Sequence, residues 1–162
     1  MRYYLIDRVT ALTPGESARG IKCVTLTDEI LHDHFPDFPM LPGALVVEAA
    51  AQLSGFLLEM TFNTNADAEG TPVLRAVLAQ IQRAKFHHAV EPGDCLDIVA
   101  TIAGMHESSA QVDFEAAVGG EQAARGTLTF VMREIDSPRV HEQRRQIYAL
   151  WTRGMSPPPV LP

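Results

Sequence analysis

Three prolines within seven residues, followed directly by a long apolar run, constrain this chain more than any other feature of its sequence. Pro36, Pro39 and Pro42 lie in the stretch HFPDFPMLPGALVVE. Proline fixes one backbone dihedral and lacks the amide hydrogen, so neither a helix nor a central strand tolerates this density. Pro42 differs, because the first turn of a helix does not need its missing N–H. We therefore expect a conformationally restricted loop over residues 32–41 and a helix over residues 43–60.

Strand signals fill most of the remaining sequence. β-branched residues, or alternating apolar and polar residues, mark five runs: residues 21–26, 73–87, 95–104, 111–118 and 124–132. The second run also has helix propensity, which leaves a helix as the alternative there. Gly119-Gly120 predicts a hairpin turn, and polar residues over 63–72 predict a loop. A single long apolar helix must be covered, so we expect an α+β fold in which a curved antiparallel sheet wraps a long central helix.

The chain changes character near residue 135. Its 162 residues suit one domain with a real core, which we assign to residues 1–135. Residues 136–162 form a C-terminal extension. Within it, HEQRRQIYALWTRG can form a short helix with Ile147, Leu150 and Trp151 on one side. The final MSPPPVLP cannot be helical and is expected to be flexible.

Charge and cysteine content limit the possible partners and compartments. The formal net charge of −7 argues against binding of free nucleic acid or anionic membranes by the whole surface. Cys23 and Cys95 lack metal-binding or redox spacing and fit a reducing compartment. Asp7 and Arg8 interrupt the first apolar residues, unlike in a signal peptide. Polar side chains also interrupt the apolar run 41–58, which argues against a membrane span. We therefore expect a soluble cytoplasmic protein.

A lone carboxylate, Glu48, stands in the middle of the apolar run and has two interpretations. Glu48, Gln52, Gly55 and Glu59 fall on one helical stripe, and such a stripe is usually the solvated face of an amphipathic helix. Alternatively, Glu48 is a carboxylic acid in an apolar pocket, where burial favours the protonated form that a general acid requires. The sequence pattern alone leaves both open.

A histidine, His34, begins the proline-rich loop and is also open to two interpretations. It is either a packed ring with one satisfied nitrogen or a base. The helix that starts at Gly43 adds free N–H groups, which stabilise developing negative charge on an oxygen. A base, an acid and an oxyanion site are the groups required for an elimination next to a thioester carbonyl.

The pattern H-F-P-x-x-P-x-x-P-G-x-x-x-x-E-A-x-x-Q, which runs here from His34 to Gln52, resembles a known signature. It is the signature of the 3-hydroxyacyl-[acyl-carrier-protein] dehydratases of fatty acid synthesis, which have the hotdog fold. The segments YLIDRVTALTPGE (4–16) and QRAKFHHAVEPGD (82–94) are similar to two further segments of that family. The resemblance covers roughly residues 3–133 and leaves out the proline-rich tail.

The resemblance implies a role for each residue of the signature. His34 would be the base at the α-carbon of a (3R)-hydroxyacyl thioester. Glu48, contributed by the other subunit of a dimer, would help the β-hydroxyl group leave as water and give a trans-2-enoyl product. The Gly43 N–H would bind the thioester carbonyl, and the Met40 carbonyl would accept from His34 and fix its tautomer. Gln52, one turn after Glu48, would orient the acid.

The resemblance also implies partners. The substrate would arrive on the phosphopantetheine of an acyl carrier protein, and its acyl chain would lie in a tunnel at the interface of a homodimer or of a trimer of dimers. No metal or organic cofactor would be needed. Arg83, Lys85 and His87 form a basic cluster in an acidic chain and would dock the carrier protein. The alternative for these three residues is a solvated strand face.

Three departures from the family pattern concern substrate range and rate. Asp37 stands where the family commonly has glycine, and an inward-pointing carboxylate would hinder a neutral His34. Phe38, a candidate substrate-binding residue, stands where a polar residue is common, and Ala89 replaces the usual proline. Two other functions stay open: an acyl thioesterase, and a non-catalytic or heteromeric hotdog subunit that binds acyl carrier protein. A metal site at His32 and His34 lacks a third ligand at a suitable spacing.

Overall fold

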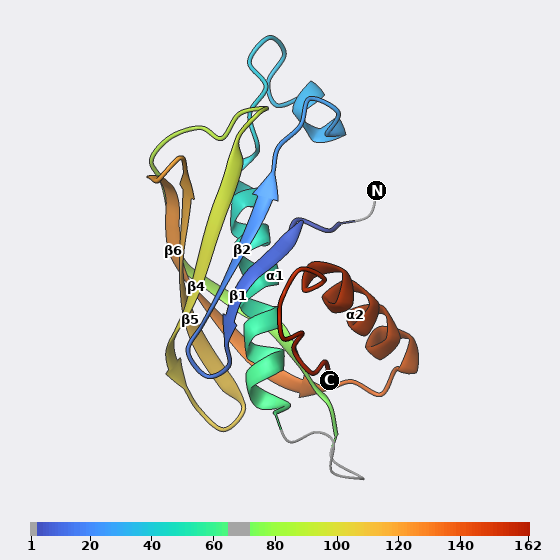
Figure 1. Ribbon diagram of the computed structural model, residues 1–162. Helices are drawn as coiled ribbons and strands as arrows, with labels where there is room; N and C mark the ends of the chain where they lie inside the picture. The colour runs from blue at the N-terminus through green and yellow to red at the C-terminus, as the bar shows by residue number, and fades with distance from the viewer. Residues whose placement is uncertain (1–2, 65–71) are drawn as a thin grey trace.

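Six antiparallel strands form one sheet, and a long helix lies across it (Figure 1). The computed structural model describes residues 3–64 and 72–162, so residues 65–71 of the expected loop lie outside the described part. The strands are β1 (Arg8–Thr13), β2 (Ser17–Cys23), β3 (Leu74–Phe86), β4 (Cys95–Met105), β5 (Ser109–Val118) and β6 (Glu121–Glu134). Their order in the sheet is β1-β2-β4-β5-β6-β3. The helices are the 3-10 turn η1 (Glu29–His32), the central α1 (Gly43–Phe62) and α2 (Pro138–Trp151).

Helix α1 begins where the prolines end, as the sequence predicts. The Pro42 carbonyl accepts from the N–H groups of Leu45 and Val46 at 2.8 and 3.2 Å and so starts the helix. Most of its side chains are buried, and they include Leu53, Phe56 and Leu57. The helix is long and apolar enough to cross a membrane, but 67% of its most apolar window is buried inside this protein. It therefore serves as the core helix that the sheet covers.

Four of the five predicted strands are confirmed. They correspond to β3, β4, β5 and β6, and continuous pairing of β3 with β6 excludes the helix alternative for residues 73–87. The run 21–26 is displaced, because the strand occupies Ser17–Cys23. The chain then turns at Thr25, whose carbonyl accepts from the Asp28 N–H at 3.0 Å. Strand β1, which no sequence pattern indicates, forms a hairpin with β2.

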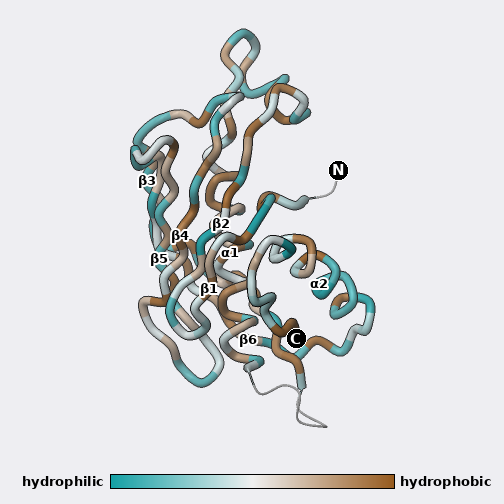
Figure 2. The backbone as a smooth tube through the Cα atoms, viewed as in Figure 1, coloured by the Kyte–Doolittle hydropathy of each residue, from teal (hydrophilic) through white to brown (hydrophobic). Residues whose placement is uncertain are grey.

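Helix α2 packs on the side of α1 that faces away from the sheet (Figure 1). It begins at Pro138, three residues before the expected start, because the Ser137 hydroxyl caps it by accepting from the Val140 N–H at 3.4 Å. The outer turns of α2 are mainly hydrophilic, whereas α1 is mainly hydrophobic (Figure 2). The extension therefore has a buried side and a solvated side.

The buried side of α2 differs from the predicted one at a single residue. Trp151 and Ile147 are buried as expected, but Leu150 is 58% exposed, and Tyr148 takes its place. The Tyr148 and Trp151 rings meet Phe56 of α1 edge to face, with centroids 4.9 and 6.3 Å apart. This aromatic cluster determines which side of α2 is buried, because an aromatic ring buries more apolar surface than a leucine side chain. Beyond the helix, Met155 and Leu161 of the proline-rich segment pack against the core.

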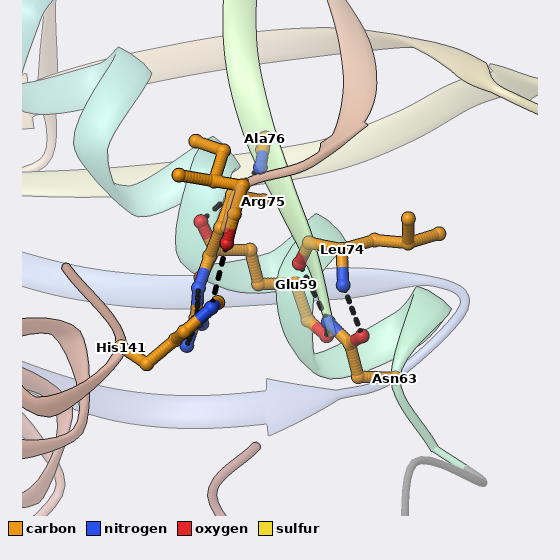
Figure 3. A network of polar contacts seen from close by, with 7 residues as sticks. Glu59, Asn63, Leu74, Arg75, Ala76 and His141 are labelled. Atoms are coloured by element: carbon orange, nitrogen blue, oxygen red, sulfur yellow. Dashed lines mark hydrogen bonds and ion pairs between the residues drawn. The ribbon is translucent and has the colours of Figure 1, made fainter. Parts of the chain in front are cut away.

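A buried polar network joins α1, β3 and α2 (Figure 3). Arg75 Nη1 donates to Glu59 Oε2 at 2.7 Å, and the two side chains are only 2% and 1% exposed. The Arg75 guanidinium also donates to Nδ1 of His141 at 3.0 Å, and Glu59 Oε1 accepts from the Ala76 N–H at 3.2 Å. Because a guanidinium can only donate, His141 Nδ1 accepts, and its Nε2 carries the hydrogen toward the Ile135 carbonyl at 2.8 Å. The solvated-face interpretation of the helical stripe is therefore wrong at Glu59.

Candidate active site

Backbone hydrogen bonds within the loop that carries His34 hold its ends together. The N–H groups of Phe35 and Phe38 each donate to the other residue's carbonyl at 2.9 Å, and the Met40 N–H donates to the His34 carbonyl at 2.9 Å. The Leu41 N–H bonds to the Val90 carbonyl at 2.7 Å, which ties the loop to the segment before β4. The prolines between these contacts limit the remaining freedom. The imidazole is thus carried by a rigid, projecting loop (Figure 1).

The tautomer of His34 follows from its hydrogen bond to a backbone carbonyl. Its Nδ1 lies 3.1 Å from the Met40 carbonyl oxygen, which can only accept. Nδ1 therefore carries the hydrogen, and Nε2 keeps a lone pair that can accept a proton. The Phe35 ring stacks on the imidazole with centroids 4.2 Å apart and limits its rotation. In the neutral form of this half-buried histidine, Nε2 is therefore the nitrogen that can accept a proton.

The two unusual loop residues point away from that arrangement. Asp37 is exposed and adopts a positive φ of 63°, which an aspartate tolerates better than most side chains. Within the described residues it forms no ion pair with His34, so the inward-pointing carboxylate considered from the sequence does not occur. Phe38 is 55% exposed.

The start of α1 lies against Phe86. A Cβ atom on Gly43 would lie 2.9 Å from the Phe86 ring, so glycine keeps this helix end close to the end of β3. The first N–H groups of a helix have no acceptor within it and are free to bind an oxygen. Gly43, Met40 and His87 line one hollow of about 420 Å³ at this point. An anionic oxygen placed there would meet both the amide groups and an imidazole.

Glu48 is held in one orientation by a glutamine, as the sequence suggests. Gln52 Nε2 donates to Glu48 Oε1 at 2.9 Å and to the Tyr3 carbonyl at 3.0 Å. The Leu5 N–H donates to Gln52 Oε1 at 3.0 Å. Because both ends of the amide have partners, its NH₂ group must face Glu48. Glu48 is thereby held in place through the N-terminal segment, a connection that the sequence does not predict.

Glu48 opens into a groove of about 520 Å³ between α1, the N-terminal segment and α2. Glu48 and Gln52 line it from α1, and the other lining residues are Tyr3, Tyr4, Val140, Gln143, Arg144, Ile147 and Trp151. The sequence does not predict the contribution of α2, because no local pattern indicates that residues 140–151 pack near residue 48. His34 does not line this groove. One chain therefore does not bring the expected base and acid into a common cavity.

The expected carrier-protein cluster is divided between two hollows. Arg83 and Lys85 line one with Asp113 and Glu115, whereas His87 lines the other with Gly43. Arg125 also lines the first hollow, so its three basic side chains outnumber the two carboxylates. Within residues 3–64 and 72–162, no three potential metal-ligating side chains come together.

Comparison with known proteins decides the family. A family model described as FabA-like domain matches residues 1–127. The chain belongs to this family. It is 34% identical over 132 residues to a protein named 3-hydroxyacyl-[acyl-carrier-protein] dehydratase FabZ of Clostridioides difficile, covering 82% of this chain and 88% of that protein. It is 37% identical over 130 residues to the protein of that name in Natranaerobius thermophilus, covering 80% and 87%.

Solved structures support the fold. The dehydratase heterocomplex ApeI:P of Xenorhabdus doucetiae superimposes with a TM-score of 0.63 at 17% identity over 81% of this chain and 84% of that one. A mutant of the thioesterase PA1618 from Pseudomonas aeruginosa gives 0.61 at 16% identity over 79% and 81%. The hotdog fold and the FabA-like dehydratase family expected from the sequence are thus confirmed.

Proposed function

We propose that this protein dehydrates (3R)-hydroxyacyl-[acyl-carrier-protein] to trans-2-enoyl-[acyl-carrier-protein] in fatty acid or related acyl-chain biosynthesis. The observation that carries the proposal is that hydrogen bonds hold both His34 and Glu48 in fixed orientations. His34 has its Nδ1 hydrogen held by the Met40 carbonyl, and Glu48 is held by Gln52. These are the orientations that a base and an acid need before substrate arrives.

The reaction is a removal of water across two carbon atoms. His34 Nε2 takes the proton from the α-carbon, and the electrons of that C–H bond form the new C=C bond. The C–O bond at the β-carbon breaks as the Glu48 carboxyl gives its proton to the leaving hydroxyl group, which departs as water. The Gly43 N–H stabilises the negative charge that develops on the thioester oxygen. This chain supplies all of these groups, and the proposal requires no metal or organic cofactor.

A homodimer is part of this proposal, because one chain keeps His34 and Glu48 apart. Strand β3 lies at an edge of the sheet and is 13 residues long. Val77 and Ile81 on it are 41% and 50% exposed, and an edge strand with exposed apolar side chains favours pairing with another strand. A second copy bound along β3 would carry its own His34 toward the first copy's Glu48. Assembly into a trimer of dimers remains a prediction.

Acyl carrier protein is the proposed carrier of the substrate, in the cytoplasm. His87 supports docking of the carrier protein near the start of α1, because it lines the same hollow as Gly43 and Met40. Arg83 and Lys85 would contribute from the adjacent hollow. Phe38, exposed beside the His34 loop, would contact the arriving thioester arm.

The experiment is hydration of a trans-2-enoyl-[acyl-carrier-protein], followed by loss of enoyl absorbance, with His34→Ala and Glu48→Gln as variants. A loss of at least about 100-fold in each, with the fold retained, is expected for removal of a general base or acid. Release of free thiol instead would indicate a thioesterase. An inactive wild-type homodimer that binds acyl carrier protein would indicate a non-catalytic or heteromeric subunit.

A further inference from the structure

The groove that contains Glu48 has a wall built from residues outside the family match. The family model ends at residue 127, whereas α2 spans Pro138–Trp151. Five side chains of this helix face Glu48 and Gln52 across the groove: Val140, Gln143, Arg144, Ile147 and Trp151. Any molecule that fills the groove therefore touches both the candidate acid and the C-terminal extension.

This wall is held in place by several independent contacts. Gln143 Nε2 donates to the Tyr4 hydroxyl at 3.3 Å, which joins α2 to the N-terminal segment at two residues that line the groove. His141 is bound to the buried Arg75, and Trp151 is packed against Phe56 (Figure 3 shows the first of these contacts). A ligand thus meets a preformed surface and does not have to order the helix first.

The wall carries one charged group that has no carboxylate partner. Arg144 is half-buried, and among residues 3–64 and 72–162 no carboxylate lies within 4.0 Å of its guanidinium. The next residue, Arg145, is exposed and pairs with Glu142 at 3.5 Å. Covering an unpaired guanidinium with hydrocarbon removes its water without replacement and is unfavourable. A ligand carboxylate would restore those hydrogen bonds, two at a time.

We propose that this groove binds the distal part of the acyl chain, and that Arg144 selects acyl chains that end in a carboxylate over chains that end in a methyl group. This inference rests on the proposed function, because it places the reacting carbons at Glu48. The chain then runs toward α2 between the aromatic side chains of Tyr3 and Trp151, which contact its methylene groups. The terminal carboxylate meets the guanidinium of Arg144.

The test compares two substrates of equal carbon count on the full-length protein. They are the trans-2-enoyl pantetheine thioesters derived from octanoic acid and from suberic acid, which differ at the far end only. The wild type is expected to favour the carboxylate-terminated thioester in kcat/KM by about tenfold or more, the effect of a charge-assisted hydrogen bond. Arg144→Met is expected to abolish that preference, whereas the matched control Arg145→Met keeps it. Equal kcat/KM values in the wild type, or an unchanged preference in Arg144→Met, would overturn the inference.

A binding measurement separates this inference from the dehydratase assignment. Trp151 is the only tryptophan of the chain and lines the groove, so its fluorescence reports occupancy without turnover. Saturated suberoyl-pantetheine is expected to change this signal with an apparent Kd at least about tenfold lower than octanoyl-pantetheine. Arg144→Met should remove the difference. This result in a protein that hydrates no enoyl thioester, crotonyl thioester included, would contradict the proposed reaction and still support the binding site. Equal affinities in all variants would exclude the site even where crotonyl thioester is hydrated.

Discussion

Removal of the Arg75 guanidinium is expected to be among the most damaging single changes in the core. In Arg75→Met the side chain keeps most of its length, but the Glu59 carboxylate stays buried with only uncharged donors, the Ala76 N–H and the Tyr148 hydroxyl. His141 Nδ1 also loses its donor. Breaking a buried ion pair from one side costs about 3–5 kcal/mol in the free energy of unfolding. For a chain of this size, that corresponds to a fall in Tm of roughly 6–20 °C.

The assay is urea unfolding followed by Trp151 fluorescence, which reports the packing of α2 on α1. The double variant Glu59→Gln/Arg75→Met removes the orphaned charge and keeps an acceptor for the Ala76 N–H. It is expected to return to within about 2 kcal/mol of the wild type, because replacement of both partners of a buried pair is often nearly neutral. The exposed control Arg145→Met should change stability by less than about 0.5 kcal/mol. A double variant as unstable as Arg75→Met would refute the reasoning, since the damage would then not come from the unpaired carboxylate.

Three further outcomes follow from single contacts. Gly126→Ala would place a Cβ 2.4 Å from the backbone oxygen of Arg83 and should cost about 1–3 kcal/mol or more in chemical denaturation, whereas Gly104→Ala has open space and should be close to neutral. Partial desolvation, with a smaller contribution from the neighbouring thiol of Cys23, raises the pKa of Cys95 to about 11. Alkylation of Cys95, measured by mass spectrometry, should therefore be slow at pH 8 and accelerate up to about pH 11. A rate that reaches its plateau near pH 9 would contradict this. Gln52→Met should lower kcat roughly tenfold by freeing the candidate acid, and an unchanged kcat would show that the amide does not position it.

The loop and the first half of the site are predictable from the sequence because their causes are local. Pro36 and Pro39 exclude a helix or a central strand from the loop, Pro42 allows the helix to start, and the spacing of His34 and Glu48 fixes their places relative to the start of α1. The Met40 carbonyl lies six residues from His34, and Gln52 lies one turn from Glu48. A short range of sequence therefore contains both orienting contacts.

The incorrect or missing parts depend on distant residues. The sequence predicts a solvated Glu59 because its charged partner, Arg75, lies on β3, and a helical stripe carries no information about a residue on another element. The basic cluster is divided because β3 ends at Phe86, so His87 lies beyond the regular alternation that places Arg83 and Lys85 on one face. The sequence does not predict strand β1, because most of its six residues are exposed and show no regular alternation.

The network at Arg75 also has a consequence for synthesis of the chain. Glu59 and Arg75 leave the ribosome close together, but His141 follows 66 residues later. Until then the guanidinium has only part of its hydrogen-bonding partners, and the aromatic surface around Phe56 has no cover. A nascent chain whose six strands have already formed therefore exposes an aggregation-prone, partly charged face of α1. Helix α2 closes that face, so shielding of this core from other chains waits until Pro138–Trp151 has been translated.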